Sequence, residues 1–76
     1  MLGMTTSQTV RNHIFPILVH ELTKEGIMKT SDSNKILQLF KDGNAKVNAA
    51  LDIYDVDHDM SDLVEALNNI ALTTSN

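Results

Sequence analysis

Apolar side chains recur at helical spacing along most of this 76-residue chain. They return every three or four positions, which places them on one face of a helix. No run alternates apolar and polar positions between two hairpin turns, so strand signals are weak. The intervals between the apolar stretches hold glycine, serine, asparagine and aspartate, which are the residues that begin and end helices. The pattern therefore predicts an all-α fold.

Four short helices account for the whole pattern. We predict them at about residues 7–25, 33–42, 45–55 and 60–71. Because their connections are short, they should pack as one compact bundle. We expect a single helical domain over residues 7–72, with a flexible N-terminus at 1–6 and a flexible tail at 73–76.

The residues at the helix ends predict how each helix starts and stops. Gly26 and Gly43 should end the first two helices, because glycine adopts the left-handed conformation without steric cost. We expect side-chain caps from Thr6 or Ser7, from Ser31 or Ser33, from Asn44, and from Asp59 or Ser61. Pro16 lies inside the first helix, where it removes one backbone donor, so we expect one kinked helix.

The apolar positions also predict the core. On the first helix the inward face should hold Val10, Ile14, Leu18 and Leu22, with Ile17 beside them. On the later helices it should hold Ile36, Leu37, Leu39, Phe40, Val47, Ala50, Leu51, Tyr54, Leu63, Val64, Leu67 and Ile70.

The first helix has more apolar positions than one face can bury. Phe15 and Val19 are four residues apart and form a second stripe. This stripe either widens the core between two neighbouring helices or stays exposed, and a contiguous exposed apolar patch usually marks a partner site. As a working hypothesis we assign Phe15 and Val19 to the binding of a partner protein, which includes a second copy of the chain.

Charge is distributed unevenly along the chain. Residues 1–46 hold all six basic residues and four acidic ones, hence a net charge of +2, whereas residues 47–76 hold six acidic residues and no lysine or arginine. Scattered lysines do not form the positive patch that nucleic acids require, so we expect no nucleic-acid partner. The asymmetry indicates either solvated faces of one bundle or self-association of opposite charges. We expect Asp55, Asp57 and Asp59 to form an acidic rim beside the partner site.

The same acidic segment resembles the opening of an EF-hand calcium loop. Positions 1, 3, 5 and 7 of such a loop would be Asp55, Asp57, Asp59 and Ser61. The loop also needs glycine at position 6 and glutamate at position 12, where this chain has Met60 and Ala66. A cap on the fourth helix explains the acidic residues more simply. We therefore expect no metal or other cofactor, and keep weak calcium binding by a cation-responsive helical domain as the alternative.

Other signals of chemistry are absent from the sequence. There is no cysteine, no glycine-rich phosphate loop and no nucleophile motif. The longest apolar run, residues 14–19, is far below the roughly 20 residues that a membrane-spanning helix needs. We expect a cytoplasmic, non-enzymatic protein that acts as a protein–protein interaction or homo-oligomerisation module without contacting a membrane.

Overall fold

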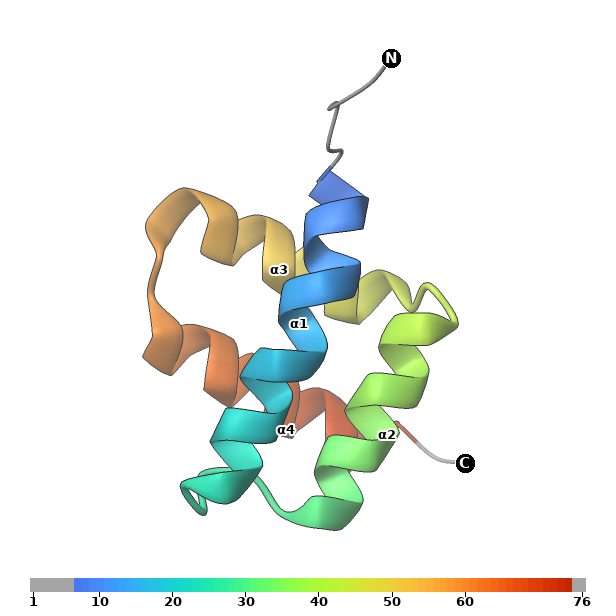
Figure 1. Ribbon diagram of the computed structural model, residues 1–76, viewed down its shortest axis with the longest axis vertical. Helices are drawn as coiled ribbons and strands as arrows, with labels where there is room; N and C mark the ends of the chain where they lie inside the picture. The colour runs from blue at the N-terminus through green and yellow to red at the C-terminus, as the bar shows by residue number, and fades with distance from the viewer. Residues whose placement is uncertain (1–6, 75–76) are drawn as a thin grey trace.

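Four α-helices follow one another in the computed structural model, which describes residues 7–74 (Figure 1). They are α1 (Ser7–Lys24), α2 (Thr30–Lys41), α3 (Ala45–Asp57) and α4 (Met60–Thr73). No strand occurs within this range, so the predicted all-α bundle of four helices is confirmed. Figure 1 shows α1 crossing in front of α3 and α4, with α2 beside it. The predicted flexible N-terminus lies outside the described residues, whereas Thr73 of the predicted tail is the last residue of α4.

Glycine ends the first two helices, as predicted. Gly26 has a φ of 77° and donates to the carbonyl of Thr23, while the next amide, that of Ile27, donates to the carbonyl of Leu22 at 2.9 Å. Gly43, with a φ of 75°, ends α2 through the same pair of hydrogen bonds. A side chain with a Cβ would be strained in this left-handed conformation, which explains glycine at both positions.

Two predicted caps are present at the starts of α3 and α4. The Asn44 side chain accepts hydrogen bonds from the backbone amides of Lys46 and Val47, at 2.9 and 3.1 Å. Asp59 accepts the amide of Asp62 at 3.1 Å. Each cap satisfies amides that have no partner inside their own helix.

The predicted serine cap of α2 is wrong. This helix begins at Thr30, and its N-cap residue, Lys29, makes no capping hydrogen bond through its side chain. Ser33 is buried on the inward face instead, where its hydroxyl donates to the carbonyl of Lys29 at 2.9 Å and lies against the hydroxyl of Thr23. Ser33 is therefore a polar contact between α1 and α2.

The long first helix continues through Pro16. Proline has no amide hydrogen, so the carbonyl one turn earlier, that of Asn12, lacks its helical donor.

A lysine side chain binds the C-terminal end of α4. Lys35 on α2 donates to the carbonyls of Ala71 and Thr74, both at 3.0 Å. These carbonyls lie at the negative end of the α4 dipole, so Lys35 neutralises them and ties α4 to α2.

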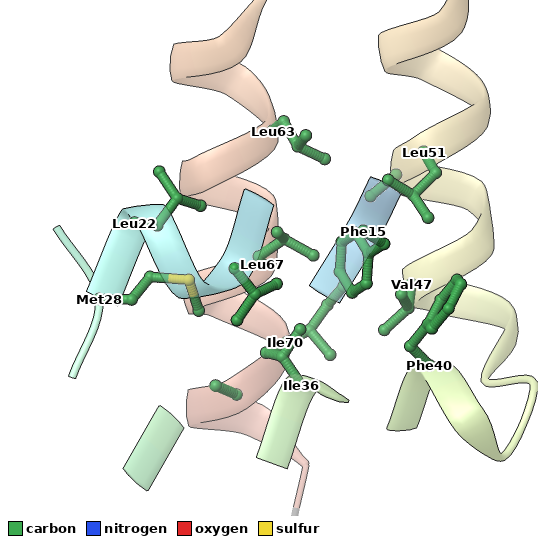
Figure 2. Packing of buried hydrophobic residues seen from close by; sticks show 13 residues of the cluster. Phe15, Leu22, Met28, Ile36, Phe40, Val47, Leu51, Leu63, Leu67 and Ile70 are labelled. Carbon is green, nitrogen blue, oxygen red and sulfur yellow. The ribbon is translucent and has the colours of Figure 1, made fainter. Parts of the chain in front are cut away.

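One apolar core joins all four helices (Figure 2). Its buried members include Ile36 and Phe40 of α2, Val47, Ala50 and Leu51 of α3, and Leu63, Leu67 and Ile70 of α4, all of them predicted. Leu37, Leu39, Tyr54 and Val64 are partly buried against this core.

The prediction for α1 is right for Leu22, which is buried, and for Leu18, which is partly buried, but it is wrong for the other three residues. The core residues of α1 are Phe15, Val19 and Leu22, whereas Val10, Ile14 and Ile17 remain 46%, 50% and 53% exposed. Phe15 lies against Phe40, with 4.6 Å between the ring centroids. A phenylalanine ring buries more apolar area than a valine or isoleucine side chain, which favours the register that buries Phe15.

Candidate partner-binding surface

The two residues assigned to a partner site on α1 cannot contact a partner in this fold. Phe15 is only 2% exposed and Val19 is completely buried. Figure 2 shows Phe15 among the core side chains of α2, α3 and α4. The hypothesis of an exposed Phe15 and Val19 stripe is therefore wrong, and the alternative of a wider core describes both residues.

The opposite stripe of α1 is the exposed one. Val10, Ile14 and Ile17 follow one another at intervals of four and three residues, so they lie on one helix face. Each leaves about half of its surface accessible. We call these three residues the α1 stripe. The sequence pattern predicted these three residues in the core and Phe15 and Val19 on the surface, so both assignments are wrong.

An apolar pocket adjoins this stripe. Val10, Ile14 and Leu18 line it from α1, while Leu51 and Tyr54 of α3 and Leu63 of α4 line it from the other side. Its volume is about 110 Å³. We call it the α1 pocket. It extends the exposed apolar surface from the α1 stripe towards α3 and α4.

A charged link borders the α1 pocket and attaches α1 to α3. The Nη2 atom of Arg11 donates to the carboxylates of Asp52, at 2.6 Å, and Asp55, at 2.7 Å. The hydrogen bond to Asp52 is the main reason why the pKa of Arg11 is raised above its usual value. The Arg11 side chain is 13% exposed, whereas those of Asp52 and Asp55 are 70% and 57% exposed. Solvent therefore screens the carboxylate side of this link.

Sequence reasoning missed Arg11, although a signal was present. Arg11 precedes Phe15 by four residues, so the two side chains share a helix face. Asp52 and Asp55 are three residues apart and share a face of α3. An arginine that is largely buried beside a large apolar residue needs an acidic partner, and the paired aspartates supply it from the exposed face of α3.

The acidic turn has a capping structure and does not form a calcium loop. Asp55 and Asp57 are helical residues of α3, so only His58 and Asp59 connect α3 to α4. Asp55 is bound to Arg11, and Asp57 accepts the backbone amide of Asp59 at 2.9 Å. Ser61 lies within α4. Over residues 7–74, no group of three or more histidine, aspartate or glutamate side chains is arranged to hold a metal ion.

Of the predicted acidic rim, only Asp55 reaches the α1 pocket. Asp57 and Asp59 line a separate hollow between α3 and α4.

The other charged and titratable side chains of α1 form no further site. His13 and His20 on α1 are both exposed. The two ion pairs within the described part of the chain are both made by Arg11.

Comparison with protein-family models, with curated proteins and with solved structures finds no significant match to this chain. Among the helices between residues 7 and 74, none has both the length and the apolar character needed to cross a membrane. A function is therefore inferred from the α1 stripe and the α1 pocket alone.

Proposed function

We propose that this chain is a non-catalytic protein–protein interaction module that docks through the α1 stripe and the α1 pocket. The observation that carries the proposal is the row of three half-exposed branched residues, Val10, Ile14 and Ile17, beside an apolar pocket. Elsewhere on α1 the large apolar side chains Phe15, Val19 and Leu22 are buried. A partner that covers the stripe removes this remaining apolar surface from water.

The magnitude of this burial indicates what the partner must provide. Full burial of one valine or isoleucine side chain contributes about 1.5–3 kcal/mol, so covering three half-exposed ones contributes roughly 2–5 kcal/mol. A micromolar complex needs about 8 kcal/mol after the entropic cost of association. The stripe alone is therefore insufficient, and the partner should also place an apolar side chain in the α1 pocket.

The acidic neighbours of the pocket orient this partner. Asp52 and Asp55 neutralise Arg11 on one side but remain more than half exposed on the other. Their outer faces favour a partner with basic residues around its apolar contact, since complementary charges steer association. Both a second copy of the chain and a different protein are candidates for this partner, and photo-crosslinking separates the two.

Photo-crosslinking tests the proposal at single positions. A photoreactive residue at Ile14 or Ile17 should give a covalent adduct, whereas the same residue at the exposed Gln38 of α2 should not. The purified protein alone reports self-association, and a cell extract reports a different partner. Sedimentation equilibrium from micromolar to millimolar concentration provides an independent measure of self-association. Equal adducts at Gln38, or no adduct at either stripe position under both conditions, would refute the proposal.

A further inference from the structure

A second apolar groove lies between α3 and α4. Two adjoining hollows, of about 300 and 410 Å³, share Ala50, Ile53 and Ala66 in their walls. Every residue that lines them belongs to α3, to α4 or to the short connection between these helices. We call the pair of hollows the α3–α4 groove. It is separate from the α1 stripe.

The walls of this groove suit a helix. Ala49, Ala50 and Ala66 have short side chains, so the backbone of a third helix can approach closely between α3 and α4. Ile53 is 59% exposed and supplies an apolar contact shared by both hollows. Because α3 has 13 residues and α4 has 14, the groove is about 20 Å long, which matches three to four helical turns.

Charge distinguishes the two ends of the groove. Four exposed carboxylates line the end near the α3–α4 connection, from Asp57, Asp59, Asp62 and Glu65. None of the four takes part in an ion pair within the described residues. The opposite end is lined by Lys46, Asn69 and Thr73. An occupant of the groove therefore meets strong negative charge at one end only.

The positive end of the α4 dipole favours Asp59 and Asp62 at this end of the groove, whereas the negative end of the α3 dipole disfavours Asp57. The last turn of α3 contains no basic residue, and Asp55 and Asp57 lie at its negative end. Arg11 neutralises Asp55, but within residues 7–74 no cationic side chain is paired with Asp57. A positive charge brought to this end of the groove would reduce the repulsion between Asp57 and the α3 dipole.

We propose that the α3–α4 groove binds an amphipathic helix of another protein, with an apolar face on Ile53 and the three alanines and with lysine or arginine at one end. The basic end lies beside Asp57, Asp62 and Glu65. The exposed α1 stripe of a second copy of this chain does not have this chemistry. On α1, the exposed stripe is continued on the same face by Glu21 and Lys24, whose charges cancel.

Synthetic helical peptides test the charge and the direction. One peptide carries a leucine and alanine face with three lysines at one end, and its control carries glutamates at the same positions. The lysine peptide should shift the backbone amide resonances of Ile53, Ala66 and Glu65 in the isotope-labelled full chain. Its affinity should fall as salt is raised, because the contacting charges are exposed. We expect the glutamate peptide to bind at least about tenfold more weakly, since like charges meet at the rim.

Substitutions at three exposed positions locate the contact. Ile53→Glu should abolish binding of the lysine peptide, whereas Val56→Glu, at a position that is 83% exposed and outside the groove, should retain it. Glu65→Gln should weaken binding and reduce its salt dependence. Circular dichroism confirms that each variant keeps its helical content.

Three results would overturn the proposal. They are equal binding of both peptides, resonance shifts confined to α1, and the absence of shifts at millimolar peptide. Crosslinking at Ile14 and Ile17 is unaffected by any of these results, so failure of this groove and failure of the α1 stripe are distinguishable.

Discussion

Replacing Phe15 by alanine tests which face of α1 is buried. Phe15 has the largest volume among the fully buried side chains of the described chain, and its ring packs on that of Phe40. Ile14 is its immediate neighbour on the helix but is half exposed. The pair Phe15→Ala and Ile14→Ala therefore compares two adjacent truncations, of which only the first should leave a cavity.

The burial of each side chain sets the expected loss of stability for the two truncations. Truncation of a buried phenylalanine to alanine costs about 3–5 kcal/mol, through lost transfer free energy and the cavity that remains. At Ile14 about half of the side chain already contacts water, and alanine is the better helix former, so the cost should stay below roughly 1 kcal/mol. A domain of this length has a total stability of about 4–11 kcal/mol. Phe15→Ala should therefore remove a large part of the free energy of unfolding.

Chemical denaturation measures this difference. Urea titrations followed by circular dichroism yield the free energy of unfolding of the two variants and the parent chain. We expect the midpoint to fall strongly for Phe15→Ala and to change little for Ile14→Ala. If Ile14→Ala costs as much as Phe15→Ala or more, the register of α1 described above is wrong, and the α1 stripe loses its basis.

Two further predictions concern the helix ends. Asp59→Ala should cost about 1 kcal/mol of stability in the same titration, whereas Asp59→Asn should retain most of it, since asparagine caps equally well; equal losses would show that the charge matters and the hydrogen bond does not. Lys35→Met should speed hydrogen exchange in the last turn of α4, because two carbonyls lose their donor, while Lys41→Met should not. Equal protection in both variants would contradict the role of Lys35.

Local chemistry made most of the helix boundaries predictable. Gly26, Gly43, Asn44 and Asp59 each act on backbone groups within five residues, so their effect can be inferred from the neighbouring sequence. The start of α2 could not be inferred in this way. Ser33 has the side chain of a capping residue, but its hydroxyl packs against Thr23 ten positions earlier, a contact that local sequence does not encode.

The position of the candidate site on α1 could not be predicted from the sequence. The excess of apolar residues on the first helix left open whether Phe15 and Val19 widen the core or stay exposed; they are buried, and Val10, Ile14 and Ile17 are exposed. Which stripe is buried depends on contacts more than twenty residues away, with Phe40 and with Asp52 and Asp55. Periodicity alone treats the two stripes as equivalent, because both have helical spacing.

The link from Arg11 to α3 explains why the α1 stripe remains exposed. Adjacent helix positions differ by about 100° around the axis, so a rotation of α1 that buried Ile14 would turn Arg11 away from α3 and Phe15 away from Phe40 of α2. Such a rotation would break both hydrogen bonds of Arg11 and separate the rings of Phe15 and Phe40. The burial gained by the half-exposed isoleucine cannot offset these losses. The register of α1 thus fixes the core and the proposed partner surface at the same time.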